Sequence, residues 1–589
     1  MAVLAAWYSP TADEIAQLPA GLYHLEQGRW GLARANPPLV RLVAAIPVWW
    51  AGYRSDWTHV DLSPAARSEF RVGQDFLAAN GPRAMHLFTL ARWACLPLAA
   101  LGGWVCWRWA GALYGPQAGL AAAALWCFCP NVLGNGALMT PDVGCASLGV
   151  WAGFRFWRWL RESSWTVAVV AGIGLGLANL AKAAWLVLLV LWPLLTLFWI
   201  VASPGAGRIR AVVRRSGQLA LAVLVAGLLV QTLYRFEGVG MRLGDYPFVS
   251  PRLTSRTAAA PGEGAINRFR GTWLTSLPIP LPREYLLGLD TQLASFDRGR
   301  PAFLLGQWKH GGWWYYYLVA ALFKVPLGAW VLLVLAIAYR LGHGLPTAMC
   351  RDEVVLLAPA VGYLLVISML GGINRHFRYV LPALPLVYLW LSSAVSCMQE
   401  WAPQYRGVAL GAHGWFVLSS LSVLPHSQTY FNELCGGPDG GYRVPLGSNV
   451  DWGQHLYFLQ RWVREHPEAQ PLYGALSYGG VRPELFGITL RPVPKAPHAG
   501  WYAVSVDRLY DPSAPCPYRL HLRPVATVAY AIHIYHIPPG AFPESSPTAN
   551  STEPPMPPRP RPALAGMQAD HAPQALPFKA TGPAGGAGR

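Results

Sequence analysis

Long hydrophobic runs, separated by short polar stretches, occupy most of the chain. An α-helix needs about 20 mainly apolar residues to cross a bilayer. On this pattern we predict ten spanning segments: 86–108, 111–129, 142–160, 165–183, 184–203, 216–234, 313–339, 353–371, 377–397 and 407–425. A shorter apolar run, 38–52, begins at a Pro-Pro pair and predicts a juxtamembrane helix lying along the interface.

These segments divide the chain into four parts. Residues 1–85 form a first extracytoplasmic loop with juxtamembrane helices, and 86–445 form a bundle of about ten helices. The bundle includes a long extracytoplasmic loop, 235–312, of the kind that covers a site.

The C-terminal part has a different composition. Residues 446–537 predict a small α/β domain, in which Asp451-Trp452-Gly453-Gln454 opens a helix and β-like runs follow at 471–478, 501–506 and 524–537. The tail, 538–589, is rich in Pro, Ala and Gly and predicts disorder. The predicted fold class is therefore mainly α, a polytopic transmembrane helical bundle with a small C-terminal α/β extracytoplasmic domain.

Composition supports a membrane protein. The chain is 53% hydrophobic and only 13% charged, whereas soluble domains carry about 25% charged residues. The formal charge of +17 could indicate nucleic-acid binding. However, the Arg residues lie mainly at helix ends and in loops, as membrane insertion requires, and no Lys/Arg-rich run accompanies them. We therefore expect a lipid bilayer and no nucleic acid among the partners.

Basic residues also predict the orientation. Four loops carry most of them: Arg155, Arg158 and Arg161; Arg208, Arg210, Arg214 and Arg215; Arg340 and Arg351; and Arg406. If these loops are cytoplasmic, alternation places Asp142, the 235–312 loop, residues 372–376 and everything after 426 on the far side. Asp13 falls there too if 38–52 does not span.

Three carboxylates are candidates for chemistry on that side. Asp13 and Glu14 follow Thr11, and Asp142 follows Thr140-Pro141. Each could simply cap a helix, because acidic side chains in a first turn complement the helix dipole. Alternatively, they converge on one outward-facing site, since ionisable groups at a membrane boundary are often functional.

A basic cluster lies on the same predicted side. Arg375, His376 and Arg378 gather where cations are normally scarce, which indicates a bound anion, and Arg forks suit phosphate oxygens. Lys182 and Lys324 interrupt apolar runs, and either could merely extend its amine to the interface.

Several function classes lack their signatures. The chain has no GxxxxGK[ST], GxGxxG, HExxH or GxSxG motif, which argues against nucleotide-driven pumps, dinucleotide enzymes, zincins and serine hydrolases. A lipid or polysaccharide transporter or flippase would predict repeats with broken helices in matching halves, which we do not find. A catalytically inactive scaffold is a further alternative. No metal site or cofactor motif is visible, and a need for a divalent cation is left open.

The motifs together resemble a known group of enzymes. Asp13-Glu14, Asn36-Pro37-Pro38-Leu39, Thr140-Pro141-Asp142 and the run 374–382 resemble the integral-membrane glycosyltransferases of the C-type fold. The pattern is most like the family 39-like superfamily of protein mannosyltransferases and aminoarabinose transferases. The stretch 430–437 and Ser448-Asn449-Val450-Asp451-Trp452-Gly453-Gln454 resemble a bacterial branch with a C-terminal extracytoplasmic domain.

This resemblance implies an activity. A sugar would move from a polyprenyl-phosphate donor to a hydroxyl of a protein or lipid acceptor, with inversion, on the extracytoplasmic face of a bacterial inner membrane. Asp13 matches the general base, Glu14 its partner and Asp142 a second acid. Lys182, Arg375, His376 and Arg378 would bind the donor phosphate.

Two features of the resemblance have no assigned consequence. The residues Ser448, Asn449, Asp451, Trp452 and Gln454 match a motif whose role is unknown. The group also has a full spanning helix before the Asp13 loop, of which this chain shows only Met1–Tyr8, so we expect a truncated first helix.

Overall fold

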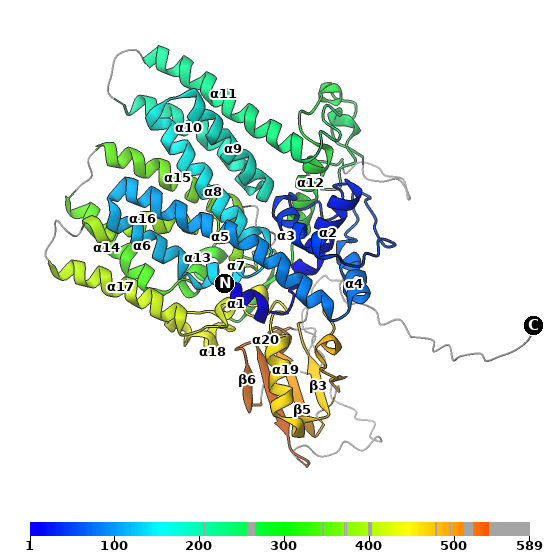
Figure 1. Ribbon diagram of the computed structural model, residues 1–589. Coiled ribbons are helices and arrows are strands. Elements are labelled where there is room, and N and C mark those ends of the chain that lie inside the picture. Colours follow the sequence, from blue (N-terminus) through cyan, green and yellow to red (C-terminus); the bar gives the residue numbers. More distant parts are fainter. Residues whose placement is uncertain are drawn as a thin grey trace, which may run out of the picture.

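The computed structural model describes residues 1–540 except 204–207, 256–265, 344–346, 370–371, 373, 398–402, 478–479, 495, 497 and 512–521. It is mainly helical, with a small sheet near the C-terminal end (Figure 1). The predicted fold class, a helical bundle with a small C-terminal α/β unit, is confirmed. The tail at 541–589, for which the sequence predicts disorder, lies outside the described residues.

Helices occupy all ten predicted segments, and the short α7 follows the second of them. They are α5 (Arg83–Tyr114), α6 (Pro116–Cys127), α7 (Pro130–Gly136), α8 (Pro141–Glu162), α9 (Trp165–Ala181), α10 (Val187–Val201), α11 (Arg208–Leu233), α13 (Tyr316–Lys324), α14 (Leu327–His343), α15 (Thr347–Met369), α16 (Leu384–Cys397) and α17 (Pro403–Leu421). Within the described residues, four helices are long and apolar enough to cross a membrane, or up to six if each of two bent pairs is one span. The chain is thus a multi-pass membrane protein.

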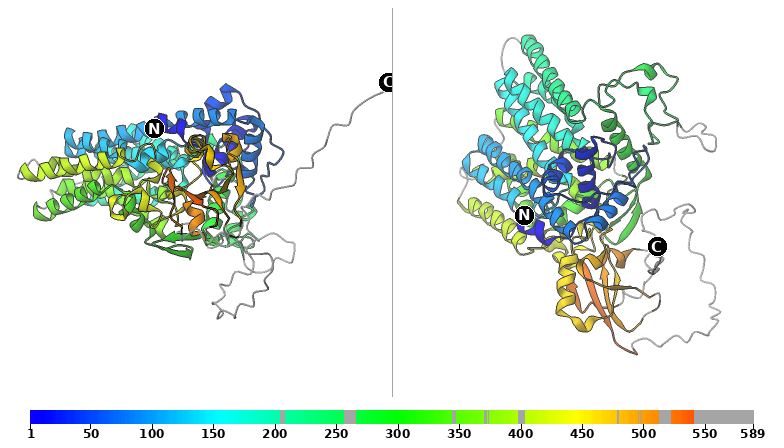
Figure 2. Two further views of the ribbon diagram at one scale, coloured as in Figure 1. Left: turned by 90° about the horizontal axis from the view of Figure 1, so that it is seen from below. Right: turned by 45° about the vertical axis from the view of Figure 1, so that its right-hand side comes forward.

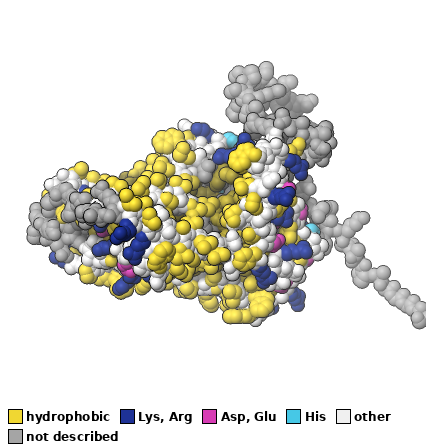
Figure 3. All heavy atoms as spheres, turned by 90° about the horizontal axis from the view of Figure 1, so that it is seen from above, with side chains coloured by type: hydrophobic (Ala, Val, Ile, Leu, Met, Phe, Trp, Pro, Cys, Tyr) yellow, Lys and Arg dark blue, Asp and Glu magenta, His cyan; other side chains and the backbone are white. Residues whose placement is uncertain are grey.

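The outer surface of the bundle is apolar, as lipid contact requires. Leu194 and Val201 of α10, Leu224 of α11 and Leu365 of α15 are all exposed. Figure 3 shows hydrophobic side chains spread over much of one face of the molecule, with Lys and Arg side chains mainly toward its two ends.

The predicted cytoplasmic loops meet at one end of the bundle. Arg161 lies 4.0 Å from Asp352, the Arg351 guanidinium donates to Ser203 Oγ at 2.8 Å, and Arg214 donates to the Ser163 carbonyl at 2.8 Å. These contacts bring three of the four basic loops together, around residues 163, 203 and 351, and the cytoplasmic placement of these loops stays a prediction.

The other end carries the extra elements (Figures 1 and 2). They are α1 (Ala2–Trp7), α2 (Ala12–Gln27), α3 (Leu39–Ala51), α4 (Glu69–Asn80), α12 (Arg283–Arg298) and the antiparallel hairpin β1 (Pro301–Leu304) with β2 (Gln307–His310). Helix α12 packs on the N-terminal part through an ion pair of 3.2 Å between Arg34 and Glu284.

The C-terminal unit is one five-stranded sheet with α19 (Leu456–Glu465) and α20 (Val506–Tyr510). The strand order is β4-β3-β5-β7-β6, where β3 (Leu472–Ala475) is parallel to β4 (Leu490–Pro492) and β5 (Gly500–Ser505). Strand β7 (Ile532–Ile537) is antiparallel to β5 and β6 (Ala526–Val528). The three predicted β-like runs thus contain β3, β5, β6 and β7, and only β4 was missed.

Several helix boundaries differ from the sequence prediction. Helix α5 continues through the break that was predicted between 108 and 111 and ends before Gly115, and two further differences lie at prolines. The segment 313–339 is not one straight helix, because α13 and α14 meet at Pro326 with a bend of 109°. The segment 377–397 begins with the 3₁₀ helix η4 (Phe377–Val380), and α16 starts only after Pro382. The helix that the sequence placed at Asp451 starts at Leu456, because Gly453 adopts φ +95° in a turn.

A candidate active site at the end of the bundle

Asp13 and Glu14 are neighbours in the first turn of α2, but they point to different surroundings. Glu14 is fully buried and closes a capping box with Thr11. Its carboxylate accepts from the Thr11 amide at 2.9 Å, from the Met139 amide at 3.1 Å and twice from Arg92 at 2.7 Å. Asp13 keeps 35% of its side chain exposed.

Arg92, from α5, is completely occupied by these contacts. Besides Glu14, its guanidinium donates to the carbonyls of Ala5, Tyr8 and Ser9 at 2.6 to 3.0 Å. Burial works to raise the pKa of Glu14, but Arg92 and the backbone donors outweigh it, so the pKa lies below its usual value. The pair holds the first residues of the chain, α2 and α5 together.

Arg378, from η4, joins the other two carboxylates. Its Nη2 lies 2.9 Å from Asp13 Oδ2, and its Nε lies 3.9 Å from Asp142 Oδ2. The side chain is 7% exposed, and its Nε and Nη1 have no hydrogen-bond partner among the described residues. Buried donors are normally satisfied, so these two N–H groups are candidates for binding an acceptor.

Lys182 completes the set from the break between α9 and the 3₁₀ helix η1 (Ala183–Leu186), where the sequence had predicted a split. Its Nζ lies 2.8 Å from Asp142 Oδ1 and 4.5 Å from the centre of the Tyr379 ring. Asp142 is 2% exposed at the start of α8. The structure therefore brings four charged side chains together, in the order Asp13, Arg378, Asp142 and Lys182, so that each carboxylate is next to a cation.

Arg375 and His376 lie beside these four charged side chains, on the loop before η4. His376 Nδ1 lies 2.6 Å from Ser448 Oγ. Burial, followed by the charges of Arg378, Arg375 and Arg300, lowers the pKa of His376, so the ring is neutral at physiological pH. Arg375 is partly exposed and, like Lys182 and Arg378, adds positive charge to this region.

The motif of unassigned role lies against this same loop. Asn449 accepts from the Phe377 amide at 2.8 Å and donates to the Arg375 carbonyl at 2.9 Å and to the Tyr316 hydroxyl at 3.0 Å. Asp451 is buried, accepts from the Gly453 amide at 3.0 Å and is hydrogen-bonded to Ser505 of β5. Burial raises the pKa of Asp451 to about 6.

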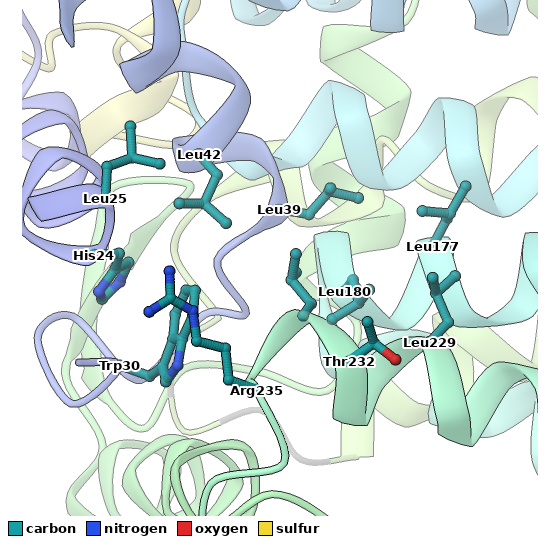
Figure 4. Close-up of a pocket in the computed structure, with 11 residues that line it drawn as sticks. His24, Leu25, Trp30, Leu39, Leu42, Leu177, Leu180, Leu229, Thr232 and Arg235 are labelled. Atoms are coloured by element: carbon teal, nitrogen blue, oxygen red, sulfur yellow. The ribbon is translucent and has the colours of Figure 1, made fainter. Parts of the chain in front are cut away.

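A separate apolar cavity of about 340 Å³ lies between α2–α3 and α9–α11 (Figure 4). Leu39, Leu180 and Leu229 line it, together with Trp30 and the basic side chain of Arg235. Leu180, which lines the cavity, precedes Lys182 of the charged site by two residues in the sequence.

The sequence analysis missed one residue of this region and left the role of another open. Arg92 was hidden inside the predicted span 86–108, although an Arg within an apolar run was itself a signal. Lys324 does not extend to an interface: it is 2% exposed, and its Nζ donates to the carbonyls of Gln428 and Asn449 at 3.0 and 2.9 Å. Among the described residues, no group of three or more His, Cys, Asp or Glu side chains could hold a metal ion.

No model of a known protein family and no curated relative matches the chain. Among the solved structures that are similar to it are two of ArnT from Cupriavidus metallidurans. The one bound to undecaprenyl phosphate has a TM-score of 0.44 and 13% sequence identity, and covers 90% of this chain and 96% of that chain. The apo structure has a TM-score of 0.41 and 14% identity with the same coverage.

Proposed function

We propose that this protein is a membrane glycosyltransferase, which moves a sugar from a polyprenyl-phosphate donor to a hydroxyl acceptor on the extracytoplasmic face. The observation that carries the proposal is Arg378. It is a buried guanidinium with Nε and Nη1 unpartnered, and it lies between a partly exposed carboxylate, Asp13, and a buried Asp142–Lys182 pair. This arrangement offers an anion site next to an accessible base.

The reaction in this proposal is a single displacement. Asp13 accepts the proton of the acceptor hydroxyl as its oxygen attacks the anomeric carbon. The bond between that carbon and the phosphate oxygen breaks, and the electron pair leaves with the polyprenyl phosphate. Attack from the side opposite the leaving group inverts the anomeric configuration. A phosphate leaving group needs cationic stabilisation rather than an acid, so one base and a set of cations are sufficient.

The remaining charged residues take supporting roles in this proposal. Arg378 would donate to the phosphate through Nε and Nη1, with Lys182 adding positive charge. Asp142 would hold Lys182 and Arg378 in place from the start of α8. Arg375 and His376 border the phosphate position. Because both carboxylate oxygens of Glu14 are engaged, we assign it to positioning Asp13 rather than to contact with the substrate.

The apolar cavity fits the other half of such a donor. An isoprenoid chain needs an apolar surface, and the leucines of α3, α9 and α11 provide one (Figure 4). The acceptor class, the sugar and the bacterial inner-membrane location stay predictions from the sequence resemblance.

Asp13→Asn tests the proposal, because an amide preserves the shape of the side chain but cannot take the proton. We expect transfer to fall by about 10²–10⁴-fold, the usual contribution of a general base. Mass spectrometry of cell-surface glycans would compare cells that carry the wild-type gene, the variant or no gene. Asp61→Asn, which changes an exposed carboxylate in the same N-terminal part, is the control.

Two results would count against the proposal in different ways. If Asp13→Asn cells keep the wild-type glycans, Asp13 is not the base. If cells with and without the gene have the same glycans and glycoproteins, the transferase activity itself is wrong.

A further inference from the structure

The motif loop, defined here as residues 448–454, comes from the C-terminal part of the chain but reaches the charged site. The Trp452 ring lies over the Arg378 guanidinium, and the distance from the ring centre to the guanidinium carbon is 3.8 Å. Trp452 is 7% exposed. An aromatic ring on the face of a guanidinium leaves the edge N–H groups free, while it blocks rotation of the side chain.

The N-terminal residues fix the position of this ring. The Trp452 carbonyl accepts from the Ala12 amide at 3.3 Å, and the Gln454 carbonyl accepts from the Ser9 amide at 3.2 Å. Ser9 Oγ donates to the Gly453 carbonyl at 2.6 Å. The motif loop is therefore attached to the segment that begins α2, one residue before Asp13.

The motif loop also forms hydrogen bonds with residues 375–377, which precede Arg378. Asn449 bridges the Arg375 carbonyl and the Phe377 amide, and Ser448 contacts His376. Arg378 is thus held twice by one loop: through the backbone that precedes it and through the face of its guanidinium. Its Nε and Nη1 are left without a protein partner in the described part of the chain.

We propose that the motif loop is a positioning element, with Trp452 as the positioning residue that aims Arg378 at the donor phosphate. This inference rests on the proposed function, because it concerns the anion site of that reaction. It explains why Asp13 and Arg378 lie close together: the motif loop is hydrogen-bonded to the backbone before each of them. Trp452 would make no contact with the phosphate itself.

Affinity for a short-chain polyprenyl phosphate tests the proposal, measured on the purified full chain in detergent. Trp452→Leu removes the ring and should weaken binding by about 10-fold or more, since the desolvated cation–π contact that fixes Arg378 is lost. Trp452→Phe keeps a ring and should stay within about threefold of wild type. Trp462→Leu is the matched control, because Trp462 lies on α19 and stacks on His466, away from Arg378.

The outcomes separate this inference from the proposed function. If the wild-type protein does not bind the polyprenyl phosphate, the proposed function fails. If the wild type binds and Trp452→Leu binds equally well, only the positioning role fails. Trp452→Met, which fills similar space without a ring, repeats the test should the Leu variant not fold. If neither ringless variant folds, Trp452 is a folding residue and the inference is overturned.

Discussion

Arg92 and Arg378 are two buried arginines at the same end of the bundle, and they are used differently. All three nitrogens of Arg92 are occupied, by Glu14 and by the carbonyls of Ala5, Tyr8 and Ser9. Arg378 has an ion pair with Asp13 through Nη2, but its Nε and Nη1 have no hydrogen-bond partner in the described structure. Only 1% and 7% of the two side chains are exposed, so burial alone does not distinguish them.

The difference separates a structural charge from one available to a ligand. A guanidinium whose donors are all bound to protein has no donor available for a substrate. Removing it leaves its buried acidic partner without a compensating charge. A guanidinium with free, buried donors carries an unmet desolvation penalty that a bound anion would remove. The two adjacent acids differ in the same way, since Glu14 forms its ion pair with Arg92 and Asp13 forms its ion pair with Arg378.

The largest expected effect is on folding, from Arg92→Ala. The substitution leaves the fully buried Glu14 without its cation, and breaking such a pair costs about 3–5 kcal/mol. We expect a large loss of folded protein and of melting temperature in detergent. Arg108→Ala, at an exposed position of the same helix, should change stability by no more than about 0.5 kcal/mol. An Arg92→Ala protein as stable as wild type would refute the structural role.

Arg378→Lys should instead change activity with little effect on folding. Lysine keeps the charge next to Asp13 but not the planar fork, so two oriented donors for the phosphate are lost. We expect transfer to fall by about 10–100-fold, which is smaller than the loss of a whole anion-stabilising donor set. Glycan mass spectrometry and melting temperature would be measured together.

Arg340→Lys provides the comparison for that experiment, since Arg340 pairs with Glu353 at the far end of the bundle. It should leave transfer unchanged. Equal losses of transfer in both variants would mean that Arg378 has no special role in the reaction.

The sequence predicted the elements and the convergence of the site better than the contacts that hold it. Apolar runs of sufficient length located the helices, and the charge of the loops correctly grouped the basic end. Asp142 and the cluster with Arg378 could be placed on one side because they lie at the outer ends of predicted segments, and Asp13 joins them if 38–52 does not span. These are local signals, which depend on composition and spacing.

Long-range pairing was not predictable in the same way. Arg92 and Glu14 are 78 residues apart, and Ser9 and Gly453 are 444 residues apart. Nothing in the local pattern says which buried Arg meets which acid, so Glu14 was expected at the chemistry beside Asp13. For the same reason, the contact between Trp452 and Arg378 could be found only from the folded chain.

The smallest expected effect is on the pH dependence of stability, where Glu14, paired with Arg92, is compared with Asp451 and Asp507. Arg92 holds the pKa of Glu14 below its usual value, whereas burial raises the pKa of Asp451 to about 6 and that of Asp507 to about 7. For Asp507 the unfolded value is 3.8, so between about pH 4 and 7 the folded state binds more protons, and stability falls as pH rises.

Asp507→Asn removes this titration and can still accept from the Gly447 amide, which now lies 2.9 Å from Asp507 Oδ1. We therefore expect the melting temperature of wild type, relative to the variant, to decline from pH 5 to pH 8. Taking the difference between the two proteins cancels the titration of histidines such as His455, whose pKa burial lowers to about 4. Parallel curves would show that Asp507 is charged in the folded protein throughout, as Glu14 is, and that a neighbouring cation such as Arg375 or Arg508 compensates it fully.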